Sequence, residues 1–178
     1  MGMTDLEEYF TRVYEAVYAD LVRFVVRRAG REVAEDIAAE ALAVAWRRSD
    51  DLPRDLDGAR PWLFGIARRL VLAHHRTSRG ALPVPLAEPT TAGHDDEVAL
   101  RTDLAHAWRQ LSARHQEALS LTVWDGLSGA QAAEVLGISP VAYRIRLSRA
   151  RTALRALLDH PPGAVTTRHP SLPERTRS

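Results

Sequence analysis

Five arginines and no acidic residue lie between Ser139 and Leu158. Arginine side chains bind phosphate oxygens and donate paired hydrogen bonds to guanine in the major groove of DNA. A helix whose arginines only face solvent would carry acids three or four residues away, so that opposite charges pair. This stretch therefore predicts contact with DNA.

The spacing of apolar residues divides a helix over 139–158 into two faces. At about 100° per residue, one apolar set shares a face and is expected to pack inward: Tyr143, Leu147, Ala150, Leu154 and Leu157. The opposite face consists of Val141, Arg144, Ile145, Ser148, Arg149 and Thr152. There Arg144 and Arg149 can contact guanine edges or phosphates, and the apolar side chains can meet thymine methyl groups.

The residues before this helix have the order typical of a helix-turn-helix. Ser128 can cap a short helix, and Gly137 can end that helix in the left-handed conformation. Ser139 can cap the start of a new helix, and Pro140 after it is typical of the first position of a helix. Two helices joined by so tight a turn, the second rich in arginine, form a DNA-reading arrangement.

Residues for other chemistry are few. The chain has no cysteine, which excludes disulfides, thiolate zinc sites and a cysteine nucleophile. His74 and His75 are adjacent, so on a helix they point about 100° apart, and neither has a partner at metal-ligand spacing. They are expected to contact phosphate or solvent, while His106 and Glu117 stand alone. No nucleophile motif or glycine-rich phosphate loop occurs, so we expect no enzyme, no metal site and no cofactor.

Hydrophobic periodicity predicts the elements that position these residues. Apolar residues recur at three and four positions in three early segments, each interpreted as a helix: 4–29, 32–48 and 59–79. After residue 98 the pattern predicts two further helices and then the two of the helix-turn-helix. The predicted fold class is all-α, with two small helical domains, the second a four-helix domain.

Composition sets the domain boundaries. We expect domains over 1–80 and 98–158, joined by a flexible linker over 81–97 that holds three prolines and little periodicity. The tail, 159–178, is expected to be disordered. The formal net charge is only +1, but 98–158 carries eight arginines against four acids. No apolar run reaches the roughly 20 residues that a membrane span needs, so we expect no membrane insertion and a cytoplasmic protein.

Three segments, the last of which contains the helix-turn-helix, carry a family resemblance when read in order. They are AEDIAAEALAVAWRR, ARPWLFGIARRLVLAHHR and DGLSGAQAAEVLGISPVAYRIRLSRARTAL. Over about residues 5–158 the chain resembles the extracytoplasmic-function sigma factors, a two-domain group of bacterial RNA polymerase initiation factors. The resemblance implies core RNA polymerase as a partner, through its β′ clamp helices and β flap, together with promoter DNA. Many members of the family also have an anti-sigma factor, although no residue here identifies one.

The resemblance also implies a role for each domain. The first would dock on the polymerase through Asp36 and Glu40 and hold the melted minus-ten element through Arg68, Arg69 and Arg76. No acid lies between Arg60 and Arg79 to neutralise these arginines, and melted strand offers phosphates and unstacked bases. The second domain would read the minus-thirty-five element as duplex DNA.

This sequence departs from the family pattern in the first domain. Ala39 and Leu42 replace the usual Gln and Phe, and Arg69 and Ala73 stand where Asn and Asp are common. These departures put the minus-ten preference in doubt, and not the role of the domain. Trp62 lies on the apolar stripe and is expected to be part of the core.

Two other classes of protein share parts of this pattern. A stand-alone helix-turn-helix regulator, with a sensing or dimerisation domain over its first 80 residues, would bind an operator duplex without polymerase. Such a domain has no reason to carry an acid-free third helix beside an acidic second one. A purely structural helical module would show no salt-dependent binding to DNA.

Overall fold

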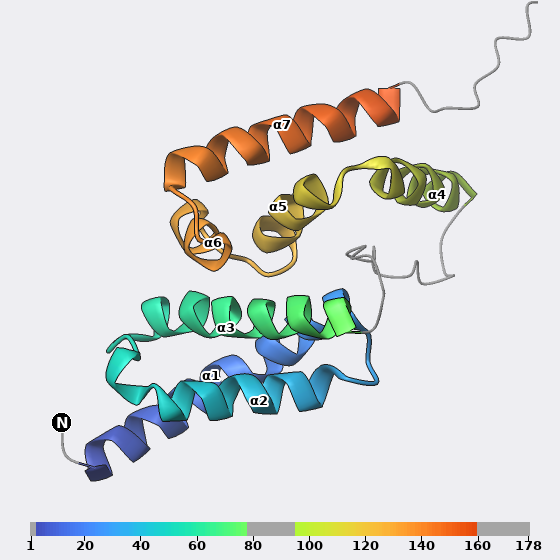
Figure 1. Ribbon diagram of the computed structural model, residues 1–178. Helices are drawn as coiled ribbons and strands as arrows, with labels where there is room; N and C mark the ends of the chain where they lie inside the picture. The colour runs from blue at the N-terminus through green and yellow to red at the C-terminus, as the bar shows by residue number, and fades with distance from the viewer. Residues whose placement is uncertain (1–2, 78–94, 160–178) are drawn as a thin grey trace, which may run out of the picture.

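The structure of the chain, a computed structural model, describes residues 3–77 and 95–159. Within these ranges it contains seven α-helices, one short 3-10 turn and no strand. The helices are α1 (Met3–Ala29), α2 (Ala34–Arg47), α3 (Leu56–Thr77), α4 (Asp95–Gln110), α5 (Ala113–Val123), α6 (Gly129–Leu136) and α7 (Pro140–Asp159). Helices α1–α3 form one layer and α4–α7 a second layer on the α3 side (Figure 1). The predicted all-α class with two helical domains is confirmed.

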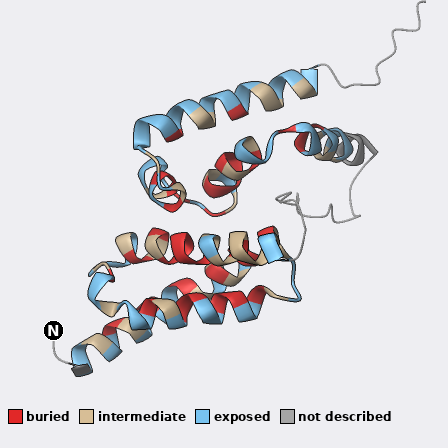
Figure 2. Ribbon diagram, viewed as in Figure 1, coloured by how far each residue is buried: buried red, intermediate tan, exposed pale blue. Residues whose placement is uncertain are grey.

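The first domain is a three-helix unit in which every helix packs against the other two. Val13, Val17 and Leu21, which belong to the predicted apolar stripe of α1, are buried. The ring centroids of Phe24 on α1 and Phe64 on α3 lie 4.7 Å apart. Figure 2 shows buried residues gathered where the three helices face one another. The expectation for Trp62 holds only in part, because its side chain packs against the core but stays half-buried.

Helix α3 begins earlier in the chain than the periodicity predicts. Asp55 caps it, accepting a hydrogen bond from the Gly58 N–H at 2.8 Å. Gly58 is also required sterically, since a Cβ there would lie 2.9 Å from the Cβ of Pro53. Pro53 and Gly58 are residues typical of loops, so the sequence predicted a loop where α3 in fact begins. Further along α3, Pro61 has no backbone N–H. The Asp57 carbonyl, which would accept the helical hydrogen bond from residue 61, therefore has no backbone donor within the helix.

The helix-turn-helix formed by α6 and α7 has the predicted local signals. Ser128 and Gln131 form a capping box at the start of α6, and Gly137 ends that helix with φ of 66°. The Ser139 hydroxyl accepts from the Ala142 N–H at 3.1 Å, and Pro140 is the first residue of α7. The fourth predicted helix, α4, begins at Asp95, inside the predicted linker 81–97. The rest of that linker before Asp95, and the tail beyond Asp159, lie outside the described residues.

The two domains pack together, which the sequence did not predict. Helix α3 lies against α6, and one hydrophobic cluster runs through both domains. From the second domain this cluster includes Leu121, Val135 and Tyr143, joined to Phe64 and Ile66 of α3. No helix in the described parts of the chain is long and apolar enough to cross a membrane.

Candidate nucleic-acid interface

The outer face of α7 presents every residue predicted for it. Six side chains are exposed: Val141, Arg144, Ile145, Ser148, Arg149 and Thr152. Val141 is 54% exposed and Ile145 49% exposed, although both are large and apolar. Within the described part of the chain, no arginine of α7 pairs with an acid. The face thus combines unneutralised positive charge with apolar side chains, which suits a DNA major groove.

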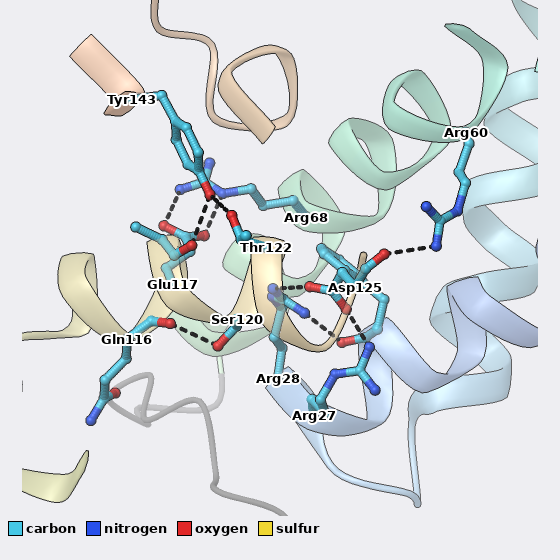
Figure 3. A network of polar contacts seen from close by, with 12 residues as sticks. Arg27, Arg28, Arg60, Arg68, Gln116, Glu117, Ser120, Thr122, Asp125 and Tyr143 are labelled. Carbon is cyan, nitrogen blue, oxygen red and sulfur yellow. Dashed lines mark hydrogen bonds and ion pairs between the residues drawn. The ribbon is translucent and has the colours of Figure 1, made fainter. Parts of the chain in front are cut away.

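The inner face of α7 is fixed by a buried tyrosine. Tyr143 is fully buried, and its hydroxyl donates to the Ala118 carbonyl at 2.8 Å and lies 2.7 Å from the Thr122 hydroxyl (Figure 3). Burial raises the pKa of the Tyr143 hydroxyl above its usual value. Ala150 is also buried, and Leu147, Leu154 and Leu157 pack against the core. Because both tyrosine contacts are on α5, they orient the outer face of α7 relative to α5.

A groove runs between the start of α5 and the N-terminal half of α7. Its volume is about 470 Å³, and its lining includes Arg114 and His115 of α5 with Ile145 and Arg149 of α7. Ser112 caps α5 here by accepting from the His115 N–H, so the positive end of the helix faces the groove. Arg114 and His115 were not among the residues predicted from the sequence. The available signal was the capping serine followed by two basic residues.

The three arginines predicted on α3 differ in their surroundings. Arg69 and Arg76 are exposed, whereas Arg68 is half-buried against the second domain. Its guanidinium donates two hydrogen bonds to the carboxylate of Glu117, at 2.6 and 3.1 Å (Figure 3). The expectation that Glu117 stands alone is therefore wrong. The two residues are far apart in sequence, and only the packing of the domains brings them together.

A second ionic group joins the end of α1 to Asp125, two residues after the end of α5. The Asp125 side chain is fully buried and accepts hydrogen bonds from Arg27 and, at 2.8 Å, from Arg28 (Figure 3). Arg60 of α3 donates to the Asp125 backbone carbonyl at 2.7 Å. Burial lowers the pKa of Arg28, and the charge of Asp125 opposes that shift. This pairing keeps a buried guanidinium charged.

The predicted acids Asp36 and Glu40 are both exposed on α2. At about 100° per residue they lie about 40° apart around the helix axis, on its solvent face. Trp46, near the end of α2, is also exposed, at 43%, and its ring centroid lies 5.1 Å from that of Phe10. At about 100° per residue it lies about 80° from Asp36 and about 120° from Glu40 around the helix axis. Exposed tryptophan side chains are enriched at surfaces that bind another protein.

The histidines have structural contacts. The Nε2 of His75 lies 2.8 Å from the Arg28 carbonyl, and its ring packs edge-on against that of His74. The expectation that His75 contacts phosphate or solvent is therefore wrong, because α3 lies against the end of α1. His106 lies 3.3 Å from Arg109 on the next turn of α4. Among the described residues, no three acids or histidines come close enough to hold a metal ion.

Family models match both domains of the chain. The model of sigma-70 region 2 matches residues 13–80, and that of sigma-70 region 4 matches residues 101–154. The extracytoplasmic-function RNA polymerase sigma factor SigL of Mycobacterium tuberculosis is 32% identical over 153 residues, covering 82% of this chain and 86% of SigL. SigC of the same organism is 35% identical over 153 residues, covering 80% of this chain and 79% of SigC.

Solved structures give the same fold. The structure of CnrH in complex with the cytosolic domain of CnrY has a TM-score of 0.59 at 25% identity, covering 84% of this chain and 87% of CnrH. The sigma factor RpoE, in complex with the anti-sigma factor NepR from Bartonella quintana, has a TM-score of 0.57 at 24% identity. That match covers 89% of this chain and 99% of RpoE.

Proposed function

The chain belongs to the extracytoplasmic-function group of RNA polymerase sigma factors, and on this premise we propose how its two domains divide the work of promoter recognition. Sigma factors are in general initiation factors and not enzymes, and we propose the same of this chain. The alternative of a stand-alone regulator is not favoured, because the family matches cover both domains. We propose the cytoplasm as the place of action, since core RNA polymerase is the partner.

Because α4 begins at Asp95, the proposed domains are 1–80 and 95–158, with 81–94 as the linker and 159–178 as the tail. The second domain reads the minus-thirty-five element as duplex DNA with the outer face of α7. The single observation that carries this assignment is the exposure of that face, where Arg144 and Arg149 pair with no acid among the described residues. Arg114 and His115, across the groove from Arg149, add phosphate contacts at the positive end of α5.

The first domain binds the polymerase and the melted minus-ten element. Asp36 and Glu40, both exposed on α2, make the ionic contacts with the β′ clamp helices. Arg69 and Arg76 are exposed on α3 and meet the phosphates of the non-template strand together with Arg68. The β flap is the proposed contact of the second domain.

We also propose an anti-sigma factor as a partner. CnrH was solved with another protein bound, the cytosolic domain of CnrY, and this chain has the same fold over most of its length. An antagonist of this kind would have to cover the polymerase-binding or DNA-binding faces named above.

The test is the binding of purified chain to core RNA polymerase and to duplex DNA, measured separately. The proposal predicts stable association with core polymerase and weak, salt-dependent binding to free duplex. Tight binding to an operator duplex without polymerase, as a dimer with half-sites about one turn apart, would instead support a stand-alone regulator.

A further inference from the structure

The outer face of α7 has a central stripe without charge, which lies between two rows of arginine. Helix α7 lies at the outer edge of the second layer, and four exposed residues form the stripe (Figure 1): Val141, Ile145, Ser148 and Thr152. At about 100° per residue the stripe spans about 60° around the helix axis. Arg144 lies about 40° beyond Ser148 on one side, and Arg149 lies about 40° beyond Ile145 on the other. The middle of this face therefore carries methyl groups and hydroxyls, and the charge lies at its edges.

The arginines on both sides of the stripe are available to bind phosphate. On one side Arg149 lines the groove of about 470 Å³ together with Arg114 and His115 of α5. On the other side Arg144 and Arg151 are exposed. Among the described residues, none of these arginines pairs with an acid. A helix with its side chains is about 10–12 Å across and the major groove about 12 Å wide, so the two rows can meet the two DNA backbones while the stripe faces the bases.

The apolar residues of the stripe, Val141 and Ile145, match one feature of the base edges. Both side chains stay exposed although they are large and apolar. The C5-methyl group of thymine is the apolar group that base edges present in the major groove. Against the other base edges, these side chains would exclude water from polar atoms without giving them a hydrogen-bond partner, which costs free energy. The pair therefore favours thymine and disfavours the other bases.

The spacing of the two side chains limits where the thymines can lie. Residues four apart on a helix have Cβ atoms about 5–6 Å apart. Base pairs in B-form DNA are stacked about 3.4 Å apart. Val141 and Ile145 can therefore contact two methyl groups that lie within about two base pairs of each other.

We propose that Val141 and Ile145 determine the sequence preference of the second domain, by contacting the methyl groups of two thymines at this spacing. The arginine rows bind the backbones and position the stripe, and Arg149 at its edge can reach a phosphate or a flanking guanine. The proposal rests on the function proposed above, since it takes the outer face of α7 to enter the major groove of the minus-thirty-five element. It adds which base the face recognises and through which chemical group.

The test begins with short duplexes that the full chain selects from a random pool at low salt, where weak binding to DNA is strongest. Each selected duplex is then made with thymine and again with deoxyuridine, which pairs in the same way but lacks the methyl group. We expect the selected duplexes to share two thymines at constant spacing. The deoxyuridine form should bind about fourfold more weakly for each methyl contact that is lost. Equal affinity for the two forms overturns the proposal.

Substitutions assign the effect to the two side chains. Val141→Ala and Ile145→Ala shorten exposed side chains and introduce the residue that helices favour most, so both variants should fold. Each should bind the thymine duplex more weakly and lose the methyl effect at one of the two positions. The control, Val123→Ala, shortens an exposed valine at the end of α5 and should leave both affinities unchanged. A methyl effect that persists when Val141 and Ile145 are both alanine would come from the shape of the DNA and would overturn the proposal.

The same duplexes are compared with the chain bound to core RNA polymerase, which separates the two proposals. A chain that distinguishes thymine from deoxyuridine but never binds core polymerase contradicts the proposed function and leaves thymine recognition standing. A chain that binds core polymerase without a methyl effect contradicts thymine recognition alone. If Val141→Ala and Ile145→Ala weaken binding to polymerase and not to duplex, the stripe contacts protein and the proposal is wrong. Failure to bind any duplex, with or without polymerase, contradicts both.

Discussion

The side-chain amide of Gln131 donates a hydrogen bond, at 3.1 Å, to the backbone carbonyl of Asp57 in the other domain. That carbonyl has no helical partner because Pro61 lacks an N–H. The same side chain accepts from the Ser128 N–H at 3.0 Å in the capping box of α6. One residue thus stabilises the start of the helix-turn-helix and also joins α6 to α3.

Substitution of Gln131 should separate these two roles. Gln131→Ala removes both and should cost about 1–2 kcal/mol of unfolding free energy, in the range of a lost helix cap. Gln131→Glu keeps an acceptor for Ser128 but cannot donate to Asp57, so it should cost less than Ala and more than nothing. Chemical denaturation of the three proteins measures the difference. A Glu variant as stable as the unsubstituted chain would show that the bond to Asp57 contributes nothing.

The Tyr143 hydroxyl should contribute to stability in a pH-dependent way. Tyr143→Phe removes the hydrogen bonds to the Ala118 carbonyl and the Thr122 hydroxyl and should cost about 1 kcal/mol at neutral pH. Because burial raises the folded pKa of Tyr143 above 10.0, its value when unfolded, the unfolded chain loses the proton first. The contribution of Tyr143 is therefore complete below about pH 10 and is lost as the pH rises above it.

Unfolding at neutral pH and at about pH 11 checks this sign. The Phe variant should lose less stability over that interval than the unsubstituted chain. Tyr9, whose pKa burial also raises, is present in both proteins and serves as the shared background. Equal losses in the two proteins would exclude Tyr143 as a source of the alkaline loss.

Local signals predicted the helix-turn-helix well, and long-range contacts were not predicted. Ser128, Gly137 and Ser139 act on neighbours within a few residues, so their types alone fix where α6 and α7 begin and end. Helical periodicity then gave the exposed face of α7. Asp125, in contrast, meets Arg28 across 97 residues of sequence, and its position after α5 is typical of an exposed acid.

The pairing of Arg68 with Glu117 was missed for the same reason. Each residue alone is consistent with a solvent-exposed position, and only the contact of α3 with the second domain decides between pairing and exposure. The start of α3 was missed because Pro53 and Gly58 are loop residues by type, whereas here they pack under the Asp55 cap. No local pattern carries that information.

Arg149 should contribute to sequence preference at the upstream element. If it donates paired hydrogen bonds to guanine, Arg149→Ala should cost on the order of 1–3 kcal/mol and relax the preference at one position. Arg151→Ala removes the same charge from the flank of α7 and should weaken binding without changing preference. Transcription from promoters with single changes in the minus-thirty-five element measures both. An unchanged sequence preference in the Arg149→Ala protein would mean that Arg149 contacts a phosphate and not a base.

Charge reversal on α2 should weaken the association with polymerase. Asp36→Arg places a positive charge on the proposed docking surface, and like charges across an interface cost several kcal/mol. Asp50→Arg makes the same change in the exposed turn after α2 and should leave binding unchanged. Fluorescence anisotropy with labelled chain and core polymerase gives both affinities, and circular dichroism confirms that each variant is folded. Normal assembly of the Asp36→Arg variant would mean that the docking surface lies elsewhere.

Run-off transcription with core RNA polymerase and a library of genomic fragments tests the central claim most directly. If the two domains recognise separate elements, transcripts should appear only when the chain is added. Their start sites should then share two upstream elements at constant spacing. An absence of chain-dependent transcripts, or start sites with one shared element only, would contradict the account.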